Sequence, residues 1–215
     1  MHACGSADRF PKAVISSCSD ASCRRNSSGI YCEVHVTIDK GKDSTIIPET
    51  ICFFHYHFPI NDVDIAEALG VLLGMWHIWS HRGKIQEQMS KAGCTEPPSI
   101  TLLTDRKSLL TSLPECKPFV VLRTMLEEVY DLKPKTNLTL AWEWRQSAMM
   151  RRCDDEANGA FESKIVTPLF LRLHEQFLRI IKTHEEWSHR LLVMDRQYLE
   201  ESSNGNHFCR CSKAD

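Results

Sequence analysis

The apolar pattern changes from a strand period to a helical period near residue 60, and this change constrains the fold more than any other feature of the chain. Residues 12–19, 29–38 and 50–58 form three runs with strand character, and apolar side chains alternate clearly in the second run. Residues 39–43, rich in charge and glycine, are typical of a tight turn. From Asn61 or Asp62, either of which can cap a helix, the apolar positions follow a helical period. The pattern predicts three antiparallel strands followed by a helix.

Two further strands are predicted at residues 99–104 and 137–144, each preceded by a helical segment. Helices are expected at 106–113, at 118–130 and again from about residue 151. A strand that follows a helical crossover usually runs parallel to a strand already in the sheet. The predicted fold class is therefore α/β, with a five-stranded mixed sheet of three antiparallel strands and then two parallel ones, flanked by helices.

The chain is expected to divide into four parts. Residues 1–11 form a loose leader, 12–165 the α/β domain, 166–201 a helical extension and 202–215 a disordered tail. Within the extension, apolar residues mark one stripe of a long helix over 168–200, with charged residues opposite. That helix is expected either to pack on the domain or to bind a protein partner.

Composition excludes several classes of protein. A formal net charge of −2 over 215 residues argues against attachment to nucleic acid by bulk charge alone. No apolar run approaches the roughly 20 residues of a membrane span, and the first residues lack the pattern of a signal peptide. The 10 cysteines are scattered rather than concentrated in a short loop-rich chain, which favours free thiols. We expect an intracellular protein that is neither secreted nor membrane-bound.

Four acidic residues stand at the ends of predicted elements. Asp20 is expected to end the first strand, Glu67 to lie in the first turn of the long helix, Asp105 to end the fourth strand, and Asp154 to open the helix after the fifth. Each position has an ordinary explanation, as a turn residue, a partner of the helix dipole or a helix cap. If the first and fourth strands are neighbours, however, the four carboxylates converge.

A cluster of carboxylates needs a compensating charge. Two carboxylates about 4 Å apart repel by roughly 4 kcal/mol at an effective dielectric constant near 20. Hard oxygen ligands suit Mg²⁺ or Mn²⁺. Two such ions about 4 Å apart activate a water molecule and stabilise the leaving oxygen of a phosphodiester.

The same residues carry a resemblance to a known family. The run SDASCRRN, which contains Asp20, resembles the first-strand motif of type 1 ribonuclease H. The run IAEA around Glu67 resembles the start of that family's first helix, and LLTDRKS around Asp105 resembles its fourth-strand motif. The runs WEW and RCDDEA, the latter containing Asp154, resemble its last strand and following helix. The resemblance covers roughly residues 12–165 in the family's motif order.

The resemblance implies a ribonuclease H fold and cleavage of the RNA strand of RNA–DNA hybrids with two Mg²⁺ ions. Carried over, Asp20, Glu67, Asp105 and Asp154 become the metal ligands and catalytic carboxylates. Asp155 is the near alternative for the fourth ligand, and Asn158 is a weaker one.

The substrate of such an enzyme contacts residues near the first and fourth strands. By the resemblance, Asn26 lies where the family contacts the RNA strand, Ser22 and Arg24 belong to the same motif, and Arg106 projects near the site. Readout of 2′-hydroxyls across a shallow minor groove gives weak sequence preference.

The sequence also departs from the family pattern. The loop at 145–150 lacks the family's histidine, Ser27 and Ser28 replace glycines, and Arg106 replaces a serine. These changes favour an alternative hypothesis, a weakened or inactive domain of retroelement origin that binds nucleic acid or protein. A nuclease or transposase acting on DNA would carry the same carboxylates. His55 and His57 alternate on one strand face, which could bind a metal, but packing against neighbours is the stronger interpretation. Trp76, His77, Trp79 and His81 lie close together on one predicted helix, where core packing is favoured over stacking on bases.

Overall fold

A single mixed sheet organises the chain. The computed structural model describes residues 11–24, 27–39, 49–58, 62–132, 137–159 and 168–184. Its strands are β1 (Lys12–Arg24), β2 (Ser27–Asp39), β3 (Glu49–Phe58), β4 (Ser99–Thr104) and β5 (Leu138–Trp142). They lie in the order β3-β2-β1-β4-β5, antiparallel from β3 to β1 and parallel from β1 to β5. The predicted α/β class and the ribonuclease H-like strand arrangement are therefore confirmed.

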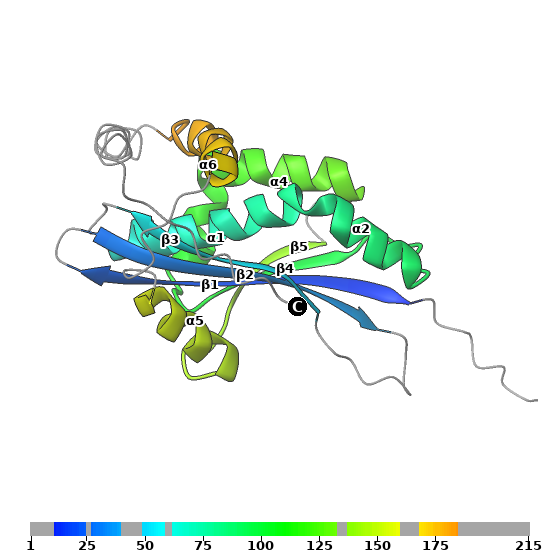
Figure 1. The fold of residues 1–215 in the computed structure, drawn as a ribbon, viewed down its shortest axis with the longest axis horizontal. Helices are drawn as coiled ribbons and strands as arrows, with labels where there is room; N and C mark the ends of the chain where they lie inside the picture. Colours follow the sequence, from blue (N-terminus) through cyan, green and yellow to red (C-terminus); the bar gives the residue numbers. More distant parts are fainter. Residues whose placement is uncertain are drawn as a thin grey trace, which may run out of the picture.

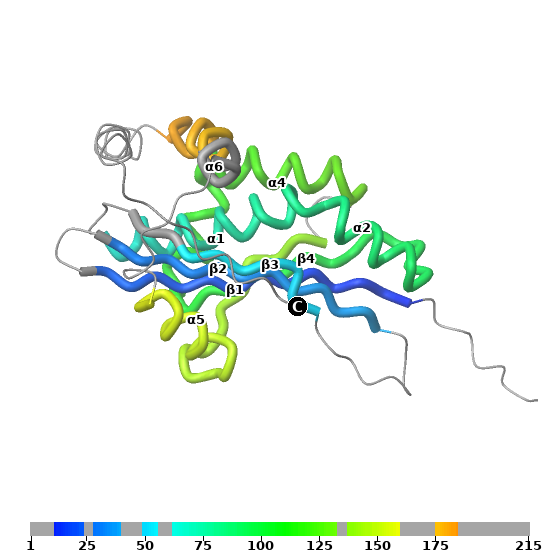
Figure 2. Tube along the Cα trace, in the orientation of Figure 1, coloured from blue at the N-terminus to red at the C-terminus, as the bar shows by residue number. Residues whose placement is uncertain are grey.

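Helices cover the two faces of this sheet unequally. On one face lie α1 (Val63–Ser80), α2 (Arg82–Lys91), α4 (Lys117–Tyr130) and α6 (Pro168–Ile181), whereas α5 (Ala148–Gly159) lies on the other (Figure 1). The tube in Figure 2 shows the same separation, with α5 below the strands. The short helix α3 (Leu109–Ser112) and the 3-10 turn η1 (Leu113–Glu115) follow β4. None of the helices in these described ranges combines the length and apolar character that a membrane span needs.

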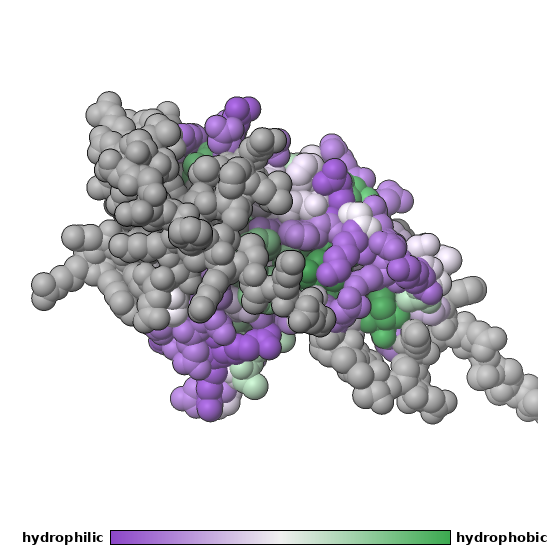
Figure 3. Space-filling view, in the orientation of Figure 1, coloured by the Kyte–Doolittle hydropathy of each residue, from purple (hydrophilic) through white to green (hydrophobic). Residues whose placement is uncertain are grey.

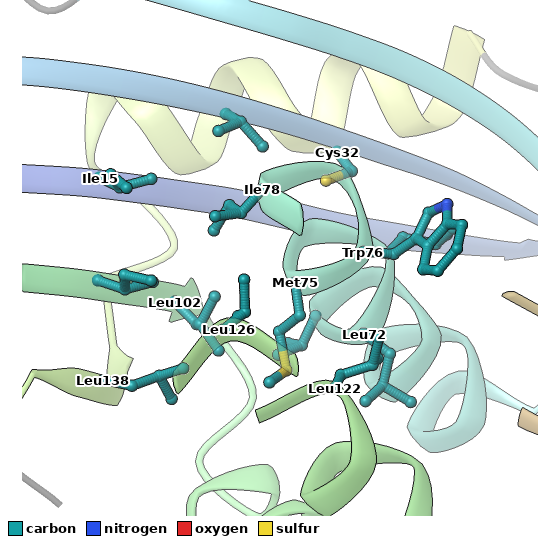
Figure 4. Close-up of a cluster of buried hydrophobic side chains, with 14 of the residues drawn as sticks. Ile15, Cys32, Leu72, Met75, Trp76, Ile78, Leu102, Leu122, Leu126 and Leu138 are labelled. Atoms are coloured by element: carbon teal, nitrogen blue, oxygen red, sulfur yellow. The ribbon is translucent and has the colours of Figure 1, made fainter. Parts of the chain in front are cut away.

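The main core lies between the sheet and α1. Thirteen consecutive α1 residues, from Ala66 to Ile78, are buried, because the sheet covers one side of the helix, α4 covers another, and Phe177 of α6 lies near Trp76. A helix that is apolar on all sides suits such a position. Figure 4 shows this packing, with side chains from the sheet, α1 and α4 meeting at one cluster. Trp76 and His77 are part of this buried helix, so the expectation of core packing there is confirmed.

The strand with the clearest alternation is buried on both sides. Ile30, Cys32 and Val34 face the α1 core, as the alternation predicts. The intervening residues Tyr31 and Glu33 are buried as well, because α5 covers the opposite face. Alternation therefore predicts the core face correctly, but it does not show that the other face is also covered.

Small residues let α1 approach β1 closely. A Cβ atom at Gly74 would lie 2.1 Å from Ser17 Oγ and 3.0 Å from Ser17 Cβ, and one at Gly70 would lie 3.0 Å from Ser19 Oγ. The two glycines are four residues apart and the two serines two apart, so each pair lies on one face of its element. This seam of Ser17, Ser19, Gly70 and Gly74 sets the height of α1 above the sheet.

Several predicted boundaries differ from the structure. The first strand continues to Arg24, and α5 begins at Ala148 rather than near residue 151. The long helix ends at Ser80, and the chain breaks at His81. The break leaves Gly83 inside α2. Each difference lies at an element end, where local pattern is weakest.

The predicted C-terminal helix is found only in part. It is helical over 168–181 and then turns at 182–184, and the rest of the expected span, 185–200, lies outside the described residues. Phe177 and Ile181 of α6 are buried in the main core. Packing on the domain is therefore found at Phe177 and Ile181, while binding of a protein partner by the rest of the predicted helix stays a prediction. The leader at 1–10 and the tail from 202 also lie outside the described residues.

Replacing Gly74 by alanine should destabilise the protein, because the added methyl group overlaps Ser17 and forces α1 away from β1. We expect a loss of about 1–3 kcal/mol in the free energy of unfolding, measured by urea denaturation. Gly83→Ala is the matched control, since a Cβ there meets nothing within 4 Å and alanine is the better helix former. Equal stability changes in the two variants would show that the seam is not tightly packed.

Candidate metal centre

At Asp20, strand β1 is still paired with β2 but no longer with β4. On one side Asp20 pairs with Tyr31 of β2, but on the other side the last pair between β1 and β4 is Cys18 with Leu103. Asp20 and Asp105 each lie two residues beyond that last pair. Because parallel strands keep their register, the two carboxylates meet where β4 stops beside the continuing β1.

Glu67 reaches the same place from α1. The helix begins after Asp62, whose carboxylate accepts a hydrogen bond from the backbone amide of Ile65 at 3.2 Å. Glu67 lies three residues before Gly70 and therefore on the same side of the helix, the side that the glycine seam holds against β1. Ligand oxygens of Asp20, Glu67 and Asp105 all lie within 4.8 Å of one another.

This three-carboxylate cluster is electrostatically unfavourable without a cation. Asp20 and Glu67 are only 3% and 4% exposed. Burial raises the pKa of Asp20 to about 6, and repulsion from Asp105 adds to the rise. A hydrogen bond with Glu67 lowers the pKa but does not cancel the effect of burial. Burial and then repulsion from Asp20 raise the pKa of Glu67 well above its usual range. The fold thus holds acidic groups where their ionised forms are penalised.

The cluster contains oxygen atoms suited to a cation. Asp20 Oδ1 accepts a hydrogen bond from the backbone amide of Ala21 at 2.9 Å. Asp20 Oδ2 and Glu67 Oε2 are buried and have no hydrogen-bond partner among the described residues. Buried polar atoms normally have a partner, so two such oxygens beside a third carboxylate fit a hard divalent cation.

Asp154 is separated from the three-carboxylate cluster by Arg145. The guanidinium of Arg145 lies between two carboxylates, with Nε 3.6 Å from Asp105 Oδ2 and Nη2 3.4 Å from Asp154 Oδ1. The charges of Asp154, Asp105 and Asp20 raise the pKa of Arg145, with Asp154 contributing most. Asp154 also raises the pKa of Asp20, so it acts on the cluster electrostatically although it is not among the three carboxylates in mutual contact.

An ion pair between a half-exposed arginine and a buried glutamate holds α5, and therefore Asp154, against the sheet. Arg152 of α5 donates to Glu33 of β2, which is 1% exposed. Tyr31 also donates to Glu33, at 2.8 Å, and His35 Nε2 lies 3.0 Å from its carboxylate. Burial favours a raised pKa for Glu33, but the hydrogen bonds from His35, Arg152 and Tyr31 outweigh it and lower the pKa. Glu33 is therefore ionised beneath α5.

Two polar contacts fix the far end of the same helix. His55 Nε2 of β3 lies 2.8 Å from Glu156 Oε2, and Ser22 Oγ donates to Asn158 Oδ1 at 2.7 Å. Between these contacts the underside of α5 is apolar, where Cys18, Met150 and Cys153 form a small second core. The outer side of α5 is hydrophilic, as Figure 3 shows in the lower part of the view.

The four predicted carboxylates occupy positions that differ in detail from those expected. Asp20 lies inside β1 rather than at its end, because the β1–β2 hairpin continues to Arg24. Glu67 is in the second turn of α1, and Asp154 is the seventh residue of α5 rather than its first. Asp105 directly follows β4, as predicted. Asp155 is more exposed than Asp154 and makes no described contact with the cluster.

The predicted substrate contacts are only partly described. Ser22 is turned toward Asn158, and Arg106 forms an ion pair with Asp64 at 2.6 Å in the first turn of α1. The side chain of Arg24 and all of Asn26 lie outside the described residues. Of the two histidines that could form a metal pair, His55 is bonded to Glu156, and the side chain of His57 is not described.

Sequence reasoning did not identify two functional residues of this site. Glu33 occupies a polar position in an alternating strand, which the pattern assigns to solvent, and only the packing of α5 buries it. Arg145 lies in an irregular segment before α5, where no periodicity indicates which way a side chain points. The basic character of residues 145–152 was the only available signal.

Comparison with known proteins gives a likeness of fold at low identity. No protein-family model and no curated protein matches the sequence. Among solved structures, LC11-RNase H1 in complex with an RNA/DNA hybrid is 13% identical, covering 69% of this chain and 96% of its own, with a TM-score of 0.41. That protein was isolated from compost by a metagenomic approach.

Two further solved structures are similar at the same level. The N-terminal ribonuclease H domain of a Mycobacterium tuberculosis protein is 16% identical, covering 71% of this chain and 99% of that one, with a TM-score of 0.38. The protease-reverse transcriptase of prototype foamy virus is 11% identical, covering 73% of this chain and 21% of that one, with a TM-score of 0.36. Likeness at this level does not transfer an activity, so the function has to be argued from the site.

Replacing Asp20 by asparagine should stabilise the metal-free protein at neutral pH. Between the ordinary aspartate pKa near 4 and the raised value of about 6, the folded protein holds a proton that the unfolded chain has lost. Wild-type stability therefore falls as pH rises through that interval, and asparagine removes the loss. We expect a gain on the order of 1–3 kcal/mol at pH 7, measured by urea denaturation in a chelator.

The matched control is Asp155→Asn, which makes the same charge change at an exposed position of α5. Its stability should follow that of the wild type across the pH range. The gain for Asp20→Asn should shrink toward pH 4, where aspartate is protonated in both states. A gain that grew as the pH fell would contradict the assignment.

Proposed function

We propose that the chain is a metal-dependent nuclease that hydrolyses the RNA strand of RNA–DNA hybrids. The carrying observation is the cluster of Asp20, Glu67 and Asp105, brought together from three elements with two buried oxygens that lack a partner. Buried carboxylates that repel one another destabilise a fold unless a cation offsets their charge. Divalent metal at this position would supply a Lewis acid and an activated water.

The proposed roles are metal binding by the carboxylates and phosphate binding by an arginine. Asp20, Glu67 and Asp105 would hold Mg²⁺ or Mn²⁺ through their oxygens, and we propose Asp154 as the fourth ligand and two ions in all. Asp154 is held within reach by the Glu33–Arg152 pair, and Arg145 now neutralises it. The Arg145 side chain is 69% exposed. When metal binds, it would release the carboxylates of Asp105 and Asp154 and pair with a substrate phosphate instead.

An aromatic surface next to the carboxylates suits a nucleic-acid substrate. Trp142 and Trp144 are exposed at 41% and 57%. Trp142 Nε1 donates to the backbone carbonyl of Asp105 at 3.1 Å, and Lys107 Nζ lies 4.3 Å from the centre of its ring. Exposed aromatic rings beside cations bind bases and backbone together. The preference for a hybrid over DNA rests on the motif resemblance.

Replacing Asp105 by asparagine should abolish cleavage of a labelled RNA–DNA hybrid in Mg²⁺ or Mn²⁺, because one ligand oxygen and its charge are lost. Double-stranded DNA and single-stranded RNA, tested in parallel, identify the substrate. Asp131→Asn is the control, since Asp131 is an exposed helix cap in the left-handed conformation that asparagine accepts. Full cleavage by the Asp105 variant would overturn the proposed site.

Replacing Trp144 by alanine should raise KM for the hybrid roughly tenfold while leaving kcat nearly unchanged, because a stacked base contributes about 1–3 kcal/mol to binding. Steady-state cleavage kinetics measure both constants. Val120→Ala removes a comparably exposed apolar side chain from α4 and should change neither. A fall in kcat with constant KM would place Trp144 outside the binding surface.

A second function, binding of nucleic acid without cleavage, is favoured by one observation. Arg145 already bridges Asp105 and Asp154, so a resident cation supplies part of the charge that metal would otherwise bring. The assay above separates the two functions. A folded protein that binds the hybrid but cuts no substrate, and that gains no stability from Mg²⁺, would be a binding domain. A working site gains about 2.7 kcal/mol at a hundredfold excess of metal over Kd.

A further inference from the structure

A second group of metal-ligating side chains lies toward the other end of α1. His77 and His81 belong to the last turn of the helix and its C-cap, and Cys52 belongs to β3, the edge strand of the sheet. The sulfur of Cys52 and one nitrogen of each histidine all lie within 4.8 Å of one another. His77 is ten residues beyond Glu67, which corresponds to about 15 Å along the helix axis. This cluster is therefore separate from the carboxylates.

The spacing of the two histidines places both rings on one side of α1. Residues four apart in a helix lie one above the other, and their ring centres are 5.8 Å apart. Cys52 Sγ lies 3.7 Å from His81 Nδ1, so the strand closes the third side of the cluster. Three ligands from two elements are thus brought together by the packing of α1 on the edge of the sheet.

Neighbouring groups fix the orientation of both rings. The ring of His77 stacks on Phe54 with centroids 4.0 Å apart and planes 5° apart. His81 Nδ1 lies 3.0 Å from the backbone carbonyl oxygen of His77 and 3.1 Å from Ser80 Oγ. Cys52 Sγ approaches the same nitrogen, so Nδ1 is the ring atom of His81 that a metal shared with Cys52 would take, in place of its contact with the His77 carbonyl.

The protonation states also suit a metal. His77 is buried, and burial followed by the charge of His81 lowers the pKa of His77 to about 3, so its ring is neutral at pH 7. Burial raises the pKa of Cys52 to about 12, while the charge of Lys84 opposes the rise. A metal would take the place of the thiol proton, so binding would release one proton.

We propose that Cys52, His77 and His81 form a site for Zn²⁺ or a similar borderline-soft divalent ion. One thiolate and two imidazoles are a ligand set typical of zinc, whereas Mg²⁺ and Mn²⁺ prefer the oxygen ligands of the carboxylate cluster. Three protein ligands leave the fourth tetrahedral position to water. A metal here would cross-link the edge strand β3 to the C-terminal end of α1.

The test is a Co²⁺ titration of the full chain, reduced with a non-thiol reductant and kept in excess Mg²⁺ so that the carboxylates are occupied. Cys209 and Cys211 are first replaced by serine, because they supply two other thiols near the end of the chain. One equivalent of Co²⁺ should produce a thiolate-to-cobalt charge-transfer band in the near ultraviolet and intense visible bands of tetrahedral cobalt. Zn²⁺ should displace both.

Cys52→Ser should lose the charge-transfer band, and His81→Gln should weaken Co²⁺ binding by at least about tenfold. Cys94→Ser, another half-buried cysteine, is the matched control and should keep the full spectrum. An unchanged charge-transfer band in Cys52→Ser, or no cobalt binding by the parent protein, would overturn the proposal. Circular dichroism of each variant establishes that it is folded.

The result is independent of nuclease activity. The Asp105→Asn protein should bind Co²⁺ at the Cys52 site with the same spectrum, because its change lies at the other cluster. Loss of the spectrum in that variant would mean that the cobalt had been reporting on the carboxylates, and this too would overturn the proposal. Zn²⁺ should also raise Tm of the parent protein but not of Cys52→Ser.

Discussion

The close contact between α1 and β1 is the constraint on which the site depends. Gly70 and Gly74 face Ser17 and Ser19 at distances that leave no room for a Cβ atom at Gly74. A larger side chain on either element would lift the helix by a fraction of its diameter. Glu67, on the same side of the helix, would then lose its place beside Asp20. The small residues of the seam therefore position a carboxylate without touching it.

The carboxylate cluster uses a feature of sheets in which parallel strands have unequal lengths. Because β4 stops at Thr104 while β1 continues to Arg24, the last residues of β1 have no strand partner on that side within the part of the chain that the structure describes. A side chain from α1 can then meet carboxylates at the strand ends. The desolvation of Asp20 and Glu67 opposes their ionisation, and Arg145 places positive charge nearby. Such a balance of buried charge is typical of sites that bind ions rather than of packing cores.

The two faces of the sheet bind their helices by different physics. The α1 face is a large apolar core, in which Leu72, Met75 and Leu126 meet side chains of the strands (Figure 4). On the other face α5 is held by the pair between Arg152 and the buried Glu33, by polar contacts at its end and by a few sulfur-containing side chains. Because the Arg152 side chain is half exposed, solvent screens its pair with Glu33, and the position of Asp154 depends on these few contacts.

The sequence by itself determined the elements and much of the candidate site. Alternation and helical period gave five strands, their directions and the principal helices, because these patterns are local and reflect which side of an element is buried. Motif order gave Asp20, Glu67, Asp105 and Asp154, while their ligand roles remain a prediction. Only the tertiary structure decided that Glu33 is buried, that Arg145 lies between two carboxylates, and that Cys52 meets His77 and His81. Each of these contacts joins residues far apart in the chain or in irregular segments, where no periodicity in the sequence records the neighbour.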